Sequence, residues 1–433
     1  MPQSDPGGEP PGEPTPCDSA FVSSAEPAEQ AKRELDAASG PTHPLRPLAT
    51  QPADVVVTVA MNGVTGRMGR NQHLERSIVA IRDAGGLARA DGSRIQVRPI
   101  LLGRNEAKLR ELADIYGVAD VSTDVAATLA DPIVDVYFDA QTTIRRADAV
   151  AMAIEAGKHV YCEKPLSDDA TVARELAAAA SKAGVKAGIV QDKLFLPGLI
   201  KLRRLLDSGF FGRLLSVRIE FGYWVFEGTD QPSQRPSWNY RAADGGGIVL
   251  DMFPHWQYVI EELFGTIESV VVLATTHIPE RVDEAGVPYV ATADDAAYGI
   301  LQLDNGVVVQ VNSSWATRVR RDELVTFHVD GTDGSAVAGL RDCVEQHRSA
   351  TPRPVWNPDI PNPIDFRATW LDVPSTGDYE NGFRAQWERY LRHVVDDEPF
   401  PWTFDRAARG TDLVEAALQS NVERRWVRLD EVE

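Results

Sequence analysis

Residues 55–69 read VVVTVAMNGVTGRMG, an apolar run that leads directly into a glycine-rich turn. A continuous apolar run is typical of a strand that helices cover on both faces. Gly66 and Gly69 match the second and third glycines of the dinucleotide-binding fingerprint, while Val64 stands where the first is usual. At Gly66 a pyrophosphate could approach the backbone, facing the N-terminus of the next helix. At Gly69 the helix could pack closely on the sheet. This stretch predicts the first strand, turn and helix of a dinucleotide-binding fold.

The alternation of strands and helices continues to residue 190. Further strands are expected at 95–102, 134–138, 159–162 and 186–190, and helices at 68–84, 106–116, 145–156 and 169–183. Beyond residue 200 we expect longer, alternating strands at 214–226, 267–276, 296–303, 307–314 and 323–330, then helices at 382–395 and 404–420. Asp304-Asn305-Gly306 predicts a hairpin turn between two of these strands.

The expected fold class is therefore α/β. An N-terminal Rossmann domain with a doubly wound parallel sheet is expected at 53–192. A C-terminal α/β domain for substrate and oligomer contacts, with a large, mostly antiparallel open sheet, is expected at 193–400. Residues 401–433 should form a C-terminal helix and strand, for which packing against the Rossmann domain is one arrangement. The proline-rich residues 1–52 are expected to be a disordered tail.

Composition excludes several classes of partner. The net charge of −20 disfavours nucleic acid and anionic membranes, which need a basic face. No apolar run approaches the length of a membrane span, and the N-terminus lacks signal-peptide features. The three cysteines, Cys17, Cys162 and Cys343, have no metal-binding spacing. We expect a cytoplasmic protein without a metal site.

The end of the second strand predicts the cofactor preference. NAD sites favour a carboxylate there, whereas this chain has Gly103-Arg104-Asn105, with Lys108 one turn later. A guanidinium and an ammonium suit the 2′-phosphate of NADP. NADP is therefore favoured and NAD stays possible, because Arg104 could equally be a solvated turn residue.

Two further groups of residues indicate chemistry. Glu163-Lys164-Pro165 ends a predicted strand, where proline fixes the backbone beside a tunable positive charge. Asp251 and His255 are four residues apart at the start of a predicted helix, so both side chains can lean to one side. A carboxylate beside an imidazole suits general acid–base catalysis. Taken alone, a plain N-cap and a buried histidine explain this second pair as well.

In order and spacing, the glycine turn, the run 153–165 (AIEAGKHVYCEKP) and Gly245-Gly246-Gly247…Asp251…His255 resemble the glucose–fructose oxidoreductase / inositol dehydrogenase / MocA (Gfo/Idh/MocA) family. The resemblance covers about residues 55–429. It implies a Rossmann domain, an open sheet that mediates dimer or tetramer contacts, and Lys164-Pro165 beside the nicotinamide, commonly with a cis bond. It also implies Lys164, Asp251 and His255 as the catalytic residues.

The expected cofactor contacts are Gly63, Thr65, Gly66, Arg67, Met68, Gly103, Arg104, Asn105, Lys108, Gln141, Glu163, Lys164 and Pro165. Weaker candidates for substrate contact are Lys193, Trp238, Asn239, Arg241 and Trp315, since aromatic and polar groups together suit a sugar face. The chain departs from the family pattern at 140–145 and 191–193, which leaves the substrate open.

The resemblance implies an NAD(P)-dependent oxidoreductase that transfers hydride between the nicotinamide and a secondary alcohol or ketone of a sugar, cyclitol or sugar derivative. Two alternatives stay open. One is a redox-assisted glycosidase or lyase with tightly bound NAD(P), and the other is a non-enzymatic NAD(P)-sensing regulator. The expected partners are a polyol or sugar and further copies of the chain, in a homodimer or homotetramer.

Overall fold

The computed structural model describes residues 52–377 and 381–432. The expected tail at 1–52 therefore lies outside the described residues, apart from Pro52. The described part belongs to one compact unit, Pro52–Glu433. None of its described helices is long and apolar enough to cross a membrane.

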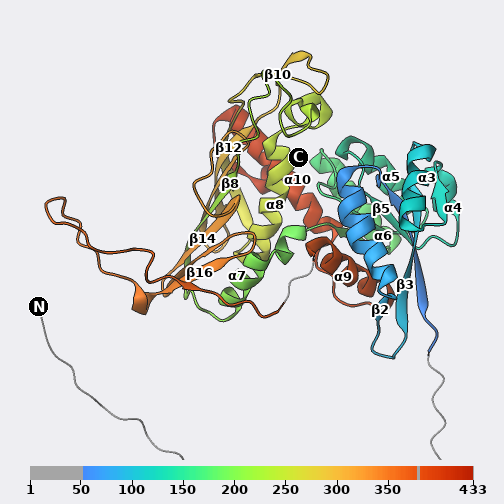
Figure 1. Cartoon of the computed structure of the whole chain (residues 1–433), viewed down its shortest axis with the longest axis horizontal. Helices are drawn as coiled ribbons and strands as arrows, with labels where there is room; N and C mark the ends of the chain where they lie inside the picture. The colour runs from blue at the N-terminus through green and yellow to red at the C-terminus, as the bar shows by residue number, and fades with distance from the viewer. Residues whose placement is uncertain (1–51, 378–380, 433) are drawn as a thin grey trace, which may run out of the picture. The chain divides into compact units, whose positions relative to one another are not determined.

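The first sheet is the expected Rossmann sheet (Figure 1). Its strands are β1 (Val55–Asn62), β2 (Leu87–Ala88), β3 (Arg94–Leu102), β4 (Asp120–Ser122), β5 (Val136–Asp139), β6 (His159–Cys162) and β7 (Ala187–Ile189). The order is β2-β3-β1-β5-β6-β7 with β4 beside β3, and all pairs except β2–β3 are parallel. The strand order reverses between β1 and β5, and ligands of doubly wound sheets bind at such a point.

Helices connect these strands. They are η1 (Gly69–Val79), a π-helix that continues as α2 (Ala80–Asp83), then α3 (Glu106–Tyr116), α4 (Val125–Ala130), α5 (Thr143–Glu155) and α6 (Ala170–Ala183). The caps follow from the sequence: Asn105, Asp124 and Asp169 each accept a hydrogen bond from the first turn of their helix. α5 packs against α6, and α9 (Gly382–Asp396) packs against η1.

The second sheet has nine strands and is mostly antiparallel, as expected. Its strands are β8 (Leu214–Gly222), β9 (Ile267–Thr275), β12 (Ala296–Leu303), β13 (Val308–Ser314), β14 (Val325–Gly331), β15 (Gly334–Ala338), β16 (Cys343–His347), β17 (Leu371–Asp372) and β18 (Val427–Arg428). The order is β17-β16-β15-β14-β8-β13-β12-β9-β18, and β8–β13 is its one parallel pair. The hairpin at 304–306 joins β12 to β13. A separate small ribbon pairs β10 (Glu280–Val282) with β11 (Pro288–Val290).

One face of this sheet is covered by helices and the other carries the exposed side chains. Helix α8 (Ile248–Leu263) contacts β9, β12 and β13, and α10 (Phe404–Glu423) contacts β9. α7 (Pro197–Asp207) contacts β15 and β16. Short helical turns, η2 (Asp192–Phe195), η3 (Ser237–Tyr240) and η4 (Ala242–Asp244), precede α7 and α8, while η5 (Arg348–Ala350) and η6 (Leu429–Glu431) follow β16 and β18.

The C-terminal helices join the two sheets. The first hydrophobic core takes in Trp387, Tyr390 and Leu391 of α9 together with the Rossmann strands. Residues 382–396, which fall within the expected 193–400 domain, thus pack on the Rossmann core. α10 contacts both α6 and α8. This packing sets the position of α8, which carries Asp251 and His255, relative to β6, which Lys164 follows.

Candidate active site

The carboxyl ends of four Rossmann strands lie in one row. Asn62 at the end of β1 is in register with Leu102 of β3 and Asp139 of β5, and Asp139 is in register with Cys162 of β6. The glycine turn, the 103–108 turn, Gln141 and Lys164 follow these ends directly. The fold therefore brings the expected cofactor contacts to a single edge.

The turn after β1 lies against the residues that follow β5, and this close approach leaves no room for a side chain at Gly63. Gly63 has a φ of +87°, and a Cβ there would lie 2.5 Å from the carbonyl carbon of Ala140. Thr65, Gly66 and Arg67 are exposed, as a backbone that receives phosphate oxygens must be. At Gly69, the first residue of η1, a Cβ would clash with the backbone of Gly63 and Val64, so the helix begins in close approach to the turn after β1.

The 103–108 turn presents two cations. Arg104 and Lys108 are exposed, and neither side chain forms an ion pair with another described residue. Asn105 instead serves the fold, since its side chain accepts a hydrogen bond from the Lys108 amide at 3.0 Å and caps α3. The turn thus fits a cofactor with an anionic group on its ribose.

Lys164 is anchored by a buried chain of hydrogen bonds behind it. The Lys164–Pro165 peptide bond is cis, as the resemblance implies. The indole N–H of Trp387 donates to His73 Nδ1 at 3.0 Å, and His73 Nε2 lies 2.8 Å from Glu163 Oε1. Glu163 Oε2 accepts from the Lys164 amide at 3.1 Å. Because Nδ1 accepts from the indole, Nε2 must carry the proton and donate to Glu163.

Asp251 lies between two cations. Its Oδ1 is 3.1 Å from Lys164 Nζ, and its Oδ2 is 2.7 Å from Arg235 Nη2. Burial alone would raise the pKa of Asp251, but the charges of Lys164 and Arg235 lower it to about 2. The arrangement differs from the expected Asp251–His255 pairing, because the described residues include no hydrogen bond or ion pair between these two side chains.

His255 is oriented by Tyr258 and Asp192 instead. The His255 Nδ1 atom lies 2.8 Å from the Tyr258 hydroxyl, which donates to Asp192 Oδ1 at 3.3 Å and accepts from the Lys193 amide at 3.2 Å. This network assigns the proton to Nδ1 and leaves Nε2 with a free lone pair. Desolvation, then the nearby charges of Lys164 and Lys193, hold the pKa of His255 well below its usual value. The imidazole is therefore neutral and can accept a proton.

Sequence patterns missed the partners of these residues. Arg235 lies in an irregular segment, and its guanidinium stacks 4.0 Å from the Trp315 ring centroid. Asp192 follows β7, and only the departure at 191–193 hinted at it. Arg146, beside Asp139 at 3.3 Å, donates to the carbonyls of Gln141 and Pro165. Each of these contacts joins residues from separate elements, so local patterns carry no signal for them.

The weaker candidates occupy different environments. Trp315 is only 1% exposed and serves as the surface beneath Arg235, not as an open sugar platform. Asn239 is buried and accepts from Arg235 at 2.8 Å. Arg241 stacks on Tyr289 at 4.5 Å, and Lys193 pairs with Asp192 at 2.6 Å. Trp238, 46% exposed, presents a free aromatic surface. Among the expected cofactor contacts, Gln141 donates a hydrogen bond from Nε2 to Asp139 Oδ2 at 2.8 Å.

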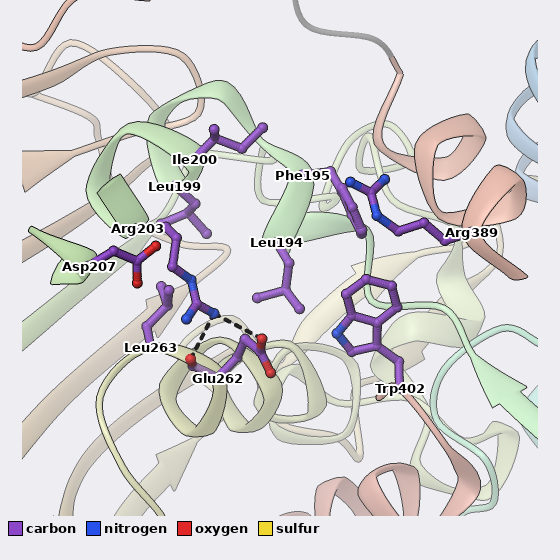
Figure 2. A pocket seen from close by; sticks show the side chains of 10 residues that line it. All are labelled: Leu194, Phe195, Leu199, Ile200, Arg203, Asp207, Glu262, Leu263, Arg389 and Trp402. Atoms are coloured by element: carbon purple, nitrogen blue, oxygen red, sulfur yellow. Dashed lines mark hydrogen bonds and ion pairs between the residues drawn. The ribbon is translucent and has the colours of Figure 1, made fainter. Parts of the chain in front are cut away.

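A separate pocket of about 360 Å³ is lined by residues of η2, α7, the end of α8 and α9, together with Trp402 (Figure 2). Its lining consists of Leu194, Phe195, Leu199, Ile200, Arg203, Asp207, Glu262, Leu263, Arg389 and Trp402. Its charges are partly engaged, since Arg203 bonds Glu262 at 2.9 Å and Arg389 stacks on Phe195 at 4.8 Å. Lys164, Asp251 and His255 do not line it, so we place the chemistry elsewhere.

Comparison with known proteins agrees with this geometry. The NAD-binding Rossmann fold of an oxidoreductase family matches residues 57–190, and the GFO/IDH/MocA C-terminal domain matches residues 199–337. D-xylose dehydrogenase of Paenarthrobacter nicotinovorans is 56% identical over 87% of this chain and 98% of its own length. Levoglucosan dehydrogenase of Pseudarthrobacter phenanthrenivorans is 26% identical over 56% of this chain and 65% of its own length.

Solved structures share the fold. A levoglucosan dehydrogenase in complex with NADH and levoglucosan superposes with a TM-score of 0.72 at 21% identity, covering 86% of this chain and 99% of the other. An NAD-binding oxidoreductase from Klebsiella pneumoniae gives 0.71, also at 21% identity, over 86% and 98%. With both domain matches and a close full-length relative, the chain belongs to the Gfo/Idh/MocA family of NAD-binding oxidoreductases.

Proposed function

We propose that this enzyme oxidises an aldopentose such as D-xylose at C1, with Lys164, Asp251 and His255 as its catalytic residues. The observation that carries the proposal is the convergence of Lys164, at the end of β6, with Asp251 and His255 of α8. The choice of sugar is supported by the dehydrogenase that is 56% identical over nearly its whole length.

The three side chains divide the work. His255 Nε2 takes the proton from the C1 hydroxyl as the C1 hydride leaves, which turns a cyclic hemiacetal into a lactone. The ammonium of Lys164 donates a hydrogen bond to the same oxygen and stabilises its developing negative charge. Asp251 holds Lys164 in place at 3.1 Å. A nicotinamide dinucleotide bound at the strand edge supplies the hydride acceptor.

The cofactor preference that we propose is NADP over NAD. Exposed Arg104 and Lys108 suit a 2′-phosphate, and Gly103-Arg104-Asn105, directly after β3, holds no carboxylate. We expect Arg104→Ala combined with Lys108→Ala to raise the dissociation constant for NADP about tenfold or more, while that for NAD changes little. Fluorescence titration of both cofactors measures this. Arg98→Ala, which removes an exposed arginine paired with Asp120 at 2.7 Å, is the matched control. Tighter NAD than NADP binding by the unmodified protein would contradict the preference.

We further propose that the enzyme assembles through the exposed face of its second sheet and works in the cytoplasm. On that face Leu273, Tyr298, Ile300 and Val308 are 49%, 40%, 42% and 45% exposed. An apolar patch of this kind marks a protein contact. The free, buried Cys162 and Cys343 agree with a reducing compartment.

A substrate panel tests the function. D-xylose, other aldopentoses, aldohexoses, inositols and sugar acids are each incubated with the enzyme and NADP or NAD, and reduced cofactor is followed by absorbance. We expect aldopentoses to give the highest kcat/KM. A xyloside is incubated in parallel, and its conversion without net cofactor reduction would instead support the redox-assisted glycosidase. No turnover of any sugar would contradict the proposal.

A further inference from the structure

An unusually long arm leaves the second sheet between β16 and β17. It spans residues 348–370, and Figure 1 shows it as the orange loop that runs out near β16, away from α7 and α8. Among the described residues, those from 352 to 368 form hydrogen bonds only within the arm, for example from the Ile360 amide to the Asn357 carbonyl at 3.2 Å. Long connections without secondary structure are uncommon in compact domains and are usually functional.

The arm presents apolar side chains that nothing in the described chain covers. Trp356 is 99% exposed, Val355 68%, Ile360 55% and Phe366 49%. The five prolines of the arm, Pro352, Pro354, Pro358, Pro361 and Pro363, restrict its backbone. A restricted segment loses less entropy on docking, and tryptophan is enriched at the energetic centres of interfaces. These properties fit a segment that docks on another surface.

The root of the arm fixes its side of the sheet. The Trp370 ring lies 5.9 Å from the ring of His328 on β14, and Gln346 of β16 donates to Thr369 at 2.6 Å. His328 points away from the core, because its neighbours Phe327 and Val329 are buried in it. The arm therefore starts on the outer face, which we propose as the assembly surface.

The same face carries a groove of about 440 Å³ at its other end. The groove is lined by Val271, Val272, Leu273, Tyr298, Gly299, Ile300, Gln310, Asn312 and Arg424. β12 lies five strand spacings from β16, or roughly 24 Å. The arm and the groove of one chain thus lie far apart on one face.

A two-fold axis removes this separation. When two outer faces meet about an axis parallel to the strands, the β16 end of each sheet lies over the β12 end of the other. The apolar side chains of the arm then meet Leu273, Tyr298 and Ile300.

We propose that residues 348–370 dock in the groove between β9, β12 and β13 of a second copy of this chain. The proposal rests on the sheet-mediated assembly proposed above. Trp356, whose side chain is 99% exposed in a single chain, is the anchor that fills the groove. Each chain contributes one arm and one groove, so the contact closes as a two-fold pair.

Sedimentation equilibrium over a range of concentrations tests the anchor. In a lone chain, Trp356→Ala changes a side chain that is already exposed and costs little stability. We expect it to raise the dissociation constant of the dimer about tenfold or more. Ile115→Ala, which truncates an apolar side chain 53% exposed on α3, is the matched control and should leave it unchanged.

Cross-linking shows where the arm lies. Ile360→Cys and Leu273→Cys chains, both with Cys17→Ser, are mixed and treated with a short bismaleimide. We expect a product of twice the chain mass only from the mixture. If dimers form but give no cross-linked product and are not weakened by Trp356→Ala, docking of the arm is disproved, while dimerisation through the sheet face still stands. A monomer at all concentrations would overturn both, and neither result affects the sugar oxidation assay.

Discussion

At the scale of single residues, the candidate site depends on Asp251, whose two carboxylate oxygens each contact a different cation. One oxygen holds Lys164 and the other holds Arg235. Because both partners are cations, the pKa of Asp251 falls to about 2 despite its burial, and it stays ionised wherever the enzyme works. A carboxylate locked in this way positions the lysine but cannot serve as the base. We therefore propose His255 as the base.

Arg235 should therefore matter although it was not foreseen. Arg235→Met removes one countercharge from Asp251 and the partner of Asn239, so we expect kcat to fall about tenfold and the free energy of unfolding by about 1–2 kcal/mol. Steady-state kinetics and urea unfolding measure the two effects. Arg235→Lys, which keeps the charge but loses the planar stacking on Trp315, should recover part of the activity. Full activity of Arg235→Met would contradict a positioning role for Arg235.

The pH profile should report the depressed pKa of His255. An ordinary histidine gains its proton near pH 6.5, whereas desolvation and the charges of Lys164 and Lys193 lower the pKa here. The acid limb of kcat for sugar oxidation should thus lie clearly below about pH 6.5. Since the unfolded chain binds this proton more readily, the same histidine lowers stability as the pH falls below that value. A limb centred near pH 6.5 would contradict this environment for the base.

At the scale of elements, the glycine turn and α9 support the site from two sides. Gly63 brings the β1 turn against Ala140, and α9 supplies Trp387 to the chain of bonds behind Lys164. Helix η1 takes part in both, because it begins at Gly69, beside Gly63, and contains His73. The glycine turn, the proposed cofactor site, is thereby connected to Lys164 through η1.

Alanine substitutions at two glycines distinguish the cost of a positive φ from the cost of a steric clash with neighbouring backbone. Gly63 and Gly92 both have positive φ, +87° and +90°, but nothing lies within 4 Å of a Cβ at Gly92. Gly92→Ala should cost only about 1 kcal/mol, the left-handed penalty. Gly63→Ala also forces the turn away from Ala140, so we expect it to lose at least about 2 kcal/mol more, together with cofactor binding. Thermal unfolding and cofactor titration check this, and equal costs at both positions would refute the close approach.

Two tryptophans of one core test the chain behind Lys164. Trp387→Phe removes the donor to His73 Nδ1, which frees the imidazole to change tautomer and release Glu163. We expect kcat to fall about tenfold with little change in the KM for sugar, because Lys164 loses its position. Trp402→Phe is the control, since its indole nitrogen has no hydrogen-bond partner among the described residues. Equal kinetics for both variants would exclude a positioning role for His73.

The hydrophobic pattern predicted most elements closely. The bounds of β6, α3 and β12 agree to the residue, because their apolar spacing and caps are local. β15 and β16 were missed, since Gly334–Ala338 is small and weakly apolar. The parallel β8–β13 pairing and the contacts of Arg235, Tyr258 and His73 also lay beyond prediction. Each is decided by residues distant in the chain, and only the family resemblance placed Lys164 beside α8.

At the scale of the whole described unit, the candidate site is formed by residues from both halves of the chain. Lys164 comes from the Rossmann domain, whereas Asp251 and His255 come from α8. α10 packs on both α6 and α8, and Arg174 of α6 bonds Asp412 of α10 at 2.7 Å. The distance between Lys164 and Asp251 is thus set by the packing of α10 on α6 and α8 rather than by either sheet alone.

The central claim is that His255 takes the proton while hydride leaves the sugar. The most direct test measures cofactor reduction by D-xylose with wild-type enzyme and with His255→Asn, alongside cofactor titration. The proposed mechanism predicts that His255→Asn lowers kcat by about 10²–10⁴ while the dissociation constant of the cofactor stays within about twofold. Turnover by His255→Asn at the wild-type rate would contradict it.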